Sequence, residues 1–371
     1  MNSKRKIPVA EPAIGEEELK YVTEAVASGW VSSAGSFISR FEKSFAEYCD
    51  SKYAFATSSG TGALHLALEA LDITAGDEVI VPTFSFIATA NAVSYTGAKP
   101  IFVDSETNTW NIDPELIEAA VSENTKAIIA VHLYGHPAKM DAILQVASKY
   151  KLSVIEDAAE AHGALYKGRK VGNIGSMGCF SFYGNKTITT GEGGMIVTDN
   201  VKLAEKLKLL RDHGMSSEQR YLHTILGYNY RMTNLQAALG VAQLNKIDSL
   251  LHAKNQIAVK YNKLLKNIPG INLPTDNEWA LRSTWLYTIM VDKDIFGKNR
   301  DQLMVFLDSC GIDTRPAFPP MHMQPIYNTG QSLPIAENLS KIGISLPSSV
   351  NLLDSDIDRV ALAIKTFHDS N

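Results

Sequence analysis

Short apolar runs alternate with amphipathic segments through the first 200 residues. The apolar runs have the length of β-strands and lie at 53–57, 78–82, 100–104, 127–133, 154–157, 179–182 and 195–198. Segments with apolar residues at helical spacing come before and between them, at 15–27, 37–49, 63–71, 85–95, 113–121 and 141–150. Because strands that alternate with helices form parallel sheets, the pattern predicts an α/β fold with a mostly parallel central sheet flanked by helices.

A long helical pattern separates this region from the rest of the chain. Thr233 and Gln236 have the spacing of a capping box, and the pattern continues, with room for a break, to Lys266. A smaller α/β unit is predicted beyond it from a strand at 285–291, a helix at 300–310, a strand at 312–315 and a helix at 356–367. We therefore expect a large domain over residues 1–250, with an N-terminal segment that lines the substrate site, and a small C-terminal domain over 251–371.

Composition and charge exclude several classes of function. Hydrophobic residues make up 45% and charged residues 20% of the chain, which is ordinary for a globular enzyme. A net charge of −5 provides no basic surface for nucleic acid or anionic membranes, and the apolar runs are too short to cross a bilayer. Three widely separated cysteines and the lack of a signal-peptide core lead us to expect a cytoplasmic protein with reduced thiols. No metal site is expected, because Gly135 and Pro137 oppose a helix that would pair His132 with His136.

A turn of small residues, Ser58 to Gly62, stands between the first predicted strand and a helix. Unpaired backbone N–H groups at such a helix start suit a phosphate. The turn is not a dinucleotide fingerprint, because His65 stands where a third glycine is needed, and the chain has no P-loop. An ordinary connecting turn is the alternative interpretation.

The most specific chemistry lies within residues 151–194. Asp157 ends an apolar run, and Lys186 follows a second apolar run in a tight turn before a glycine cluster at 191–194. Pyridoxal phosphate chemistry requires such a pair: the amine forms a Schiff base with the aldehyde, and the carboxylate keeps the ring nitrogen protonated. A lysine in a glycine-containing loop is more often simply solvated, so the surrounding motifs decide whether Lys186 is interpreted as a cofactor lysine.

Four stretches together resemble one family. SSGTGALHLAL (58–68), VIEDAAEAHGA (154–164), SFYGNKTITTGEGGM (181–195) and NYRMTNLQAALGVAQL (229–244) are similar to the DegT/DnrJ/EryC1/StrS sugar aminotransferases. These are pyridoxal-phosphate enzymes of fold type I, and the similarity runs from about residue 7 to the C-terminus. The resemblance implies a transaminase that takes nitrogen from L-glutamate and passes it to a nucleotide-linked keto sugar.

The resemblance also assigns cofactor contacts. Lys186 would carry the cofactor and then move the proton, Asp157 would pair with the pyridinium nitrogen, and Glu160 would contact the phenolic oxygen or the lysine. Phe86 would stack on the ring. The remaining expected contacts are Gly60, Thr61 and Ser181 at the phosphate, and Asn229 reaching from the partner subunit of a homodimer with shared active sites.

Substrate contacts are expected from several further positions. Arg231 and Arg315 are candidates for the diphosphate or the donor carboxylate, and surface or capping roles are equally open. Trp30 lies in a small-residue loop that either connects two helices or lines the substrate. The other expected contacts are His162, Phe318 and His322.

A closer resemblance concerns the sugar. SGWVSSAG (28–35), YGNKTITTGEGG (183–194) and RPAFPPMHMQPIY (315–327) are similar to the family members that aminate C4 of GDP-4-keto-6-deoxy-D-mannose for O-antigen or another surface glycan. His162 departs from many of those members, which carry a small apolar residue there. Aminotransferases for UDP- or dTDP-sugars therefore stay open. A sugar dehydratase is less favoured because those relatives have His in place of Lys186, and a non-catalytic regulator is disfavoured by the full set of cofactor residues.

Overall fold

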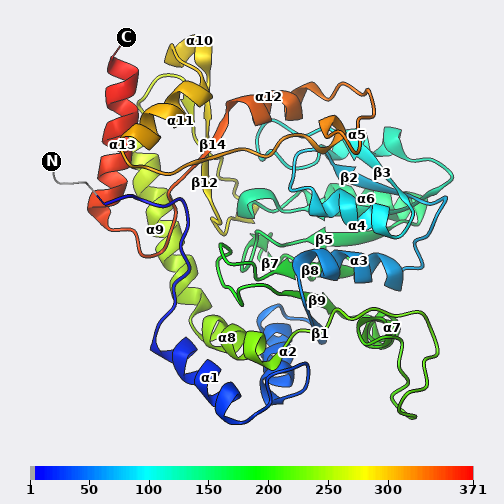
Figure 1. The fold of residues 1–371 in the computed structure, drawn as a ribbon. Coiled ribbons are helices and arrows are strands. Elements are labelled where there is room, and N and C mark those ends of the chain that lie inside the picture. Colours follow the sequence, from blue (N-terminus) through cyan, green and yellow to red (C-terminus); the bar gives the residue numbers. More distant parts are fainter. Residues whose placement is uncertain (1–4, 371) are drawn as a thin grey trace.

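Seven strands form the central sheet of the computed structural model, which describes residues 5–370 (Figure 1). Their order is β1-β9-β8-β5-β4-β2-β3. Their bounds are Tyr53–Thr57 (β1), Glu78–Pro82 (β2), Lys99–Val103 (β3), Thr125–Val131 (β4), Ser153–Asp157 (β5), Met177–Ser181 (β8) and Gly194–Thr198 (β9). All neighbours from β3 to β8 are parallel, and only β9 runs antiparallel to its two neighbours. The predicted mostly parallel sheet is confirmed.

Both faces of this sheet are buried. Along β4, Ala127 and Ile129 belong to one apolar cluster, whereas Ile128 and Ala130 belong to another, because successive strand residues point to opposite faces. The first cluster is completed by α3 (Gly60–Ala70), α4 (Ala88–Tyr95) and α7 (Val201–Arg211). The second is completed by α1 (Glu16–Ala27), α2 (Ser36–Tyr48), α6 (Met140–Tyr150) and α8 (Asn234–Asn245). This double cover is what the continuous apolar runs of the strands require.

A second sheet lies in the C-terminal part, with the order β10-β12-β14-β13. Its strands are Ile271–Asn272 (β10), Tyr287–Val291 (β12), Gly343–Leu346 (β14) and Arg315–Pro316 (β13). An apolar cluster joins the sheet to α9 (Ile247–Leu265), α11 (Arg300–Ser309) and α13 (Asp354–Asp369). Figure 1 shows α9 running from the central sheet to this C-terminal unit. The predicted boundary at residue 250 falls within α9, and the division into two domains stays a prediction.

The remaining elements are short. They are α5 (Pro114–Ile117), η1 (Glu118–Ala120), η2 (Leu133–Gly135), α10 (Lys293–Phe296), η3 (Met321–Met323), α12 (Pro334–Ile342), and a small sheet of β6 (Leu165–Tyr166), β7 (Arg169–Lys170) and β11 (Ala280–Leu281). Within residues 5–370, no helix is both long enough and apolar enough to span a bilayer.

Several predicted element bounds are wrong. The helix expected at 113–121 is only α5 followed by the 3-10 turn η1, and the helix expected from 85 begins at Ala88. The strand expected at 312–315 is instead β13, because Arg315 and Pro316 pair with β14. These bounds depend on contacts with distant segments, which local patterns do not contain. By contrast, the break allowed for in the long helical pattern is confirmed at Lys246, whose φ of −112° and ψ of 12° separate α8 from α9.

Candidate functional site

The carboxyl ends of the strands β5 and β8 and the start of α3 surround a cavity of about 460 Å³. Ligands collect at this edge of α/β sheets. The residues that line it are Ser59, Gly60, Thr61, Leu64, Ser85, Phe86, Ala88, Thr89, Val131, Asp157, Ala159, Glu160, Ser181, Tyr183, Asn185, Lys186, Glu192, Trp285 and Phe318. Eight of the predicted site residues are among them: Gly60, Thr61, Phe86, Asp157, Glu160, Ser181, Lys186 and Phe318.

Lys186 places its amine inside this cavity. Its backbone N–H donates to the carbonyl of Tyr183 at 2.9 Å, which closes the turn after β8. Its Nζ lies 3.8 Å from Glu160 Oε1, and the side chain is only 10% exposed. Burial lowers the pKa of Lys186, while the charges of Glu160 and Asp157 oppose that shift. The balance favours the neutral amine, which is the nucleophilic form.

Asp157 ends β5 and points its carboxylate into the same cavity. Thr89 Oγ1 donates to Asp157 Oδ2 at 2.7 Å, and the Ala159 N–H donates to Oδ1 at 3.2 Å. Burial raises the pKa of Asp157, whereas these two hydrogen bonds and the charge of Lys186 lower it. A cation placed against this carboxylate would stabilise its ionised form.

Glu160 lies one turn beyond Asp157. Its Oε2 accepts a hydrogen bond from the Tyr134 N–H at 2.7 Å, and its Oε1 faces Lys186. Burial raises the pKa of Glu160 to about 7, against the opposing charge of Lys186. The pKa values of the two groups are thus shifted toward each other by the same burial.

The start of α3 has the form of an anion site. Ser59 caps the helix by accepting from the Gly62 N–H at 3.0 Å, and the N–H groups of Gly60 and Thr61 belong to the turn that lacks intrahelical acceptors. Gly60 packs directly on Ser181: a Cβ at Gly60 would lie 2.8 Å from the Ser181 Cβ. Only glycine therefore lets the helix start and the end of β8 close together around one ligand group.

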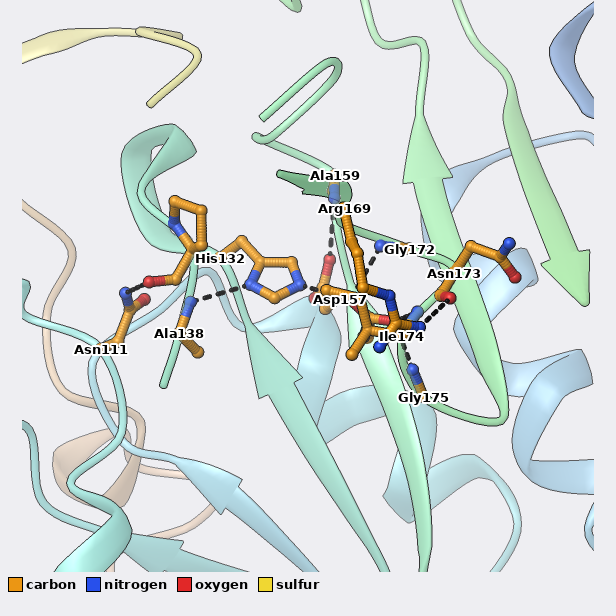
Figure 2. A network of polar contacts seen from close by, with 12 residues as sticks. Asn111, His132, Ala138, Asp157, Ala159, Arg169, Gly172, Asn173, Ile174 and Gly175 are labelled. Carbon is orange, nitrogen blue, oxygen red and sulfur yellow. Dashed lines mark hydrogen bonds and ion pairs between the residues drawn. The ribbon is translucent and has the colours of Figure 1, made fainter. Parts of the chain in front are cut away.

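A network of polar contacts surrounds the end of β5 beside Asp157 (Figure 2). The neighbouring Glu156 is 0% exposed; its Oε2 lies 3.0 Å from His132 Nε2 and accepts from the Gly172 N–H at 2.8 Å. Its Oε1 accepts from the N–H groups of Ile174 and Gly175, both at 2.6 Å. The Ala138 N–H donates to His132 Nδ1 at 3.0 Å, so the ring proton is on Nε2, toward Glu156. Burial alone raises the pKa of Glu156, but His132 and the amides lower it overall.

Aromatic side chains form the wall opposite the sheet. Phe86 is 56% exposed and lies 6.0 Å from Phe318, measured between ring centroids. Phe318 stacks on Tyr134 at 5.5 Å with an interplanar angle of 2°. Trp285 lies beside both, with its ring centroid 3.7 Å from Lys186 Nζ. The exposed Phe86 ring thus offers an aromatic face to the cavity.

Six predicted residues lie outside the cavity lining. Trp30 is 60% exposed, and Asn229 is exposed next to Asp212. Arg231 and Arg315 form ion pairs with Asp212 and Asp313, at 2.9 and 2.6 Å. His162 is fully buried against Phe180 and Phe182, and His322 Nδ1 lies 2.7 Å from Thr83 Oγ1. Their predicted contacts with a substrate or a partner subunit stay predictions.

Several lining residues were not predicted. Tyr183, Asn185 and Glu192 lie in the same motif as Lys186, so proximity in sequence could have indicated them. Thr89 of α4 donates to Asp157, and Trp285 lies in the segment just before β12. No local pattern signals that Trp285 reaches a lysine 99 positions earlier in the chain, because this contact depends on how the two sheets meet.

The cavity fits pyridoxal phosphate. It combines an anion-binding helix start, a buried carboxylate for the ring nitrogen, an amine and an exposed aromatic face. Asn185 Oδ1 is buried there without a hydrogen-bond partner within residues 5–370, so it is available to a ligand donor. In the same part of the chain, no group of three or more His, Cys, Asp or Glu side chains could hold a metal ion.

Comparison with known proteins places the chain among sugar-modifying aminotransferases. The model of the DegT/DnrJ/EryC1/StrS aminotransferase family matches residues 12–365. The chain is 46% identical over 369 residues to a GDP-perosamine synthase of Caulobacter vibrioides, covering 98% of this chain and 99% of that one. It is 43% identical to the GDP-perosamine synthase of Escherichia coli O157:H7, covering 98% of each.

Solved structures agree with this assignment. S. venezuelae DesV, in complex with a ketimine intermediate, superposes with a TM-score of 0.92 at 36% identity, covering 99% of this chain and 100% of that chain. Helicobacter pylori PseC, an aminotransferase involved in the biosynthesis of pseudoaminic acid, has a TM-score of 0.94 at 29% identity and the same coverage. The chain belongs to the DegT/DnrJ/EryC1/StrS aminotransferase family and is a pyridoxal-phosphate-dependent aminotransferase.

Proposed function

We propose that the chain moves the amino group of L-glutamate to C4 of GDP-4-keto-6-deoxy-D-mannose and so makes GDP-perosamine. The observation that carries this proposal is full-length identity of 41–46% to the GDP-perosamine synthases of three bacteria. The cavity supports it, since a lysine amine and the carboxylates of Asp157 and Glu160 line the same space.

The chemistry divides between the cofactor and the chain. Bound pyridoxal phosphate supplies an electron sink that stabilises a carbanion at the amino-bearing carbon. The Lys186 amine, whose pKa burial lowers, would hold the cofactor and then carry the proton at Nζ. Asp157 would pair with the ring nitrogen, and Glu160, whose Oε1 lies 3.8 Å from Lys186 Nζ, would stabilise the charged form of that amine.

Other contacts follow from position. Gly60, Thr61 and Ser181 bind the phosphate at the start of α3, and Phe86 covers one face of the ring. The cavity itself contains three carboxylates, Asp157, Glu160 and Glu192, and only one cationic side chain, Lys186. A nucleotide diphosphate therefore needs further cations, and Arg231, Arg315 and a second copy of the chain are the proposed sources.

The proposed assembly is a homodimer with shared active sites. Asn229 and Arg231 follow a projecting segment whose apolar side chains are exposed, including Leu226 at 86% and Tyr221 at 75%. A patch of this kind is typical of a protein–protein contact. A dimer would bring Asn229 to the partner's phosphate site. The proposed setting is the cytoplasm, where the product would enter synthesis of O-antigen or another surface glycan.

The test uses the cofactor's visible absorbance. The protein is loaded with pyridoxal phosphate, converted to the amine form with L-glutamate and freed of excess donor. GDP-, UDP- and dTDP-4-keto-6-deoxyhexoses are then added separately. Rapid return of the visible band with only the GDP-mannose derivative is expected.

The other outcomes have distinct meanings. Return of the band with a UDP- or dTDP-sugar would keep the transaminase and overturn the choice of sugar. A loaded protein that never shows the visible band would overturn the role of Lys186. Loss of a sugar hydroxyl without transfer of nitrogen would favour the dehydratase.

A further inference from the structure

Trp285 joins the turn that carries Lys186 to the C-terminal unit. It lies just before β12, yet its ring contacts Lys186 Nζ at 3.7 Å from the ring centroid. Its Nε1 donates to the carbonyl of Asn185 at 2.8 Å. One side chain, 5% exposed, therefore touches both the amine of Lys186 and the backbone of its turn.

The orientation of this ring is determined by its surroundings. Tyr134 and Phe318 stack with Trp285 at interplanar angles of 16° and 15°. The segment before it is pinned as well, because the Ser283 N–H donates to the Gly135 carbonyl at 3.1 Å. A Cβ at Gly135 would lie 1.6 Å from the Ser283 carbonyl oxygen, so the two backbones meet where only glycine fits.

Lys254 binds the backbone of Trp285. This α9 residue is 5% exposed, and its Nζ donates to the Trp285 carbonyl at 2.7 Å. No carboxylate within residues 5–370 lies within ion-pair distance of it. Burial without a counter-charge lowers the pKa of Lys254 to about 7. Burying an amine costs more free energy than burying an apolar side chain of the same size. The contribution of Lys254 that offsets this cost is its hydrogen bond to the Trp285 carbonyl.

We propose that Trp285 is a catalytic residue whose ring holds the Lys186 amine in position, and that Lys254 is the positioning residue that holds Trp285. This inference rests on the proposed role of Lys186. The face of an indole attracts an ammonium group and so opposes the effect of burial on Lys186. The charged and titratable groups on the other sides of the amine are Glu160, Asp157 and His162, with Glu192 across the cavity.

The test measures how fast cofactor-free protein captures pyridoxal phosphate as pH is varied. Only the neutral amine reacts, so the midpoint of this profile reports the pKa of Lys186. Trp285→Leu is expected to move the midpoint down by about half to one and a half pH units. Trp279→Phe is the matched control, since Trp279 packs on His136 and Tyr166, and it should leave the midpoint in place. An unmoved midpoint in Trp285→Leu would overturn the role of Trp285.

Two Lys254 variants test the positioning role. Lys254→Met removes the donor and is expected to move the midpoint in the same direction as Trp285→Leu. Lys254→Gln keeps an N–H donor without a charge and should restore most of the wild-type profile. A folded Lys254→Met protein with the wild-type midpoint would overturn the role of Lys254. Should Lys254→Met not fold, Lys254→Leu takes its place as the variant without a donor, and a wild-type midpoint in that folded protein would overturn the role.

A chemical control separates this inference from the proposed function. Borohydride reduction and peptide mapping of the loaded wild-type protein should find the cofactor attached to Lys186. Attachment elsewhere, or none, would overturn the proposed role of Lys186. Attachment to Lys186 together with an unmoved midpoint in Trp285→Leu would overturn the Trp285 inference alone.

Discussion

Burial acts in opposite directions on the ionisable side chains that share the cavity. It lowers the pKa of Lys186 and raises those of Asp157 and Glu160, the latter to about 7. All three groups therefore move toward their neutral forms. A positive ring nitrogen against Asp157 would restore its charge, so cofactor binding and the ionisation of Asp157 depend on each other.

The charge of Asp157 can be removed while its shape is kept. Asp157→Asn is expected to slow the half-reaction with L-glutamate roughly 10²–10³-fold, because electrostatic stabilisation is lost where charge develops. Cofactor affinity should fall less than about tenfold, since phosphate contacts remain. Single-turnover absorbance and equilibrium titration measure the two effects. Thr89→Val, which removes one hydrogen bond to Asp157, should cost less than about tenfold in rate. Equal losses in rate and affinity for Asp157→Asn would contradict the assigned role.

His162 is predicted to make the protein sensitive to acid. Burial, and then the charge of Lys186, lowers its pKa from 6.5 to about 3. Between these values the unfolded chain binds more protons than the folded one, so stability is lost as pH falls below about 6.5. His162→Phe places an apolar ring beside Phe180 and Phe182 and removes the titrating imidazole. Its stability relative to wild type should rise by about 1 kcal/mol per pH unit from pH 6 to pH 4.

Urea unfolding at several pH values measures this difference. Parallel stability curves for the two proteins would contradict it. The same variant tests the sequence-based expectation that His162 contacts substrate, because a contact would appear as a raised KM at neutral pH.

At the scale of elements, Glu156 ties three segments together. It joins the end of β5 to His132 after β4 and to the amides of the loop 172–175 (Figure 2). The backbone N–H of His132 also donates to the backbone carbonyl of Asp157 at 3.1 Å. The backbone that presents Asp157 is thus held by a carboxylate on the opposite face of the strand.

Glu156→Gln is expected to destabilise the protein by roughly 2–4 kcal/mol, because an amide cannot accept from all of these donors and leaves buried N–H groups unpaired. Glu118→Gln is the matched control. Glu118 pairs with Lys149 at the surface, where water screens the pair, so this variant should be close to wild type in stability. Denaturant unfolding measures both. A double-mutant cycle with His132→Asn should give a coupling above about 1 kcal/mol, and additive effects would contradict a shared network.

At the scale of the molecule, residues 213–228 project beside α7 (Figure 1). Leu226, near the base of this segment, is 86% exposed, which a partner surface would explain. Leu226→Glu is expected to raise the monomer fraction at micromolar concentration and to lower activity in proportion. Leu362→Glu on α13, at a site 64% exposed, is the control and should leave the assembly unchanged. Sedimentation velocity measures the mass, and an unchanged dimer in Leu226→Glu would contradict this contact.

Prediction from sequence succeeded where the signal is local. The strands β1, β2, β5 and β9 lie within a residue of the apolar runs, because buried strands must be apolar on both faces. Asp157 and Lys186, predicted from their position after such runs and from the surrounding motifs, line one cavity, and their roles stay predictions. The bounds of β13 and the short strand β6 were missed because their partners β14 and β11 are distant in sequence.

The sequence by itself determined the α/β architecture, the small-residue turn before α3 and the strand ends near which Asp157 and Lys186 lie, since each depends on periodicity or on a local motif. Only the tertiary structure decided which side chains share the cavity. It brought Trp285 to Lys186, Thr89 to Asp157 and Tyr134 to Glu160, and it left Trp30, Arg231 and Arg315 outside the lining. These contacts depend on how helices and sheets pack, and packing joins residues whose separation in the chain carries no local signal.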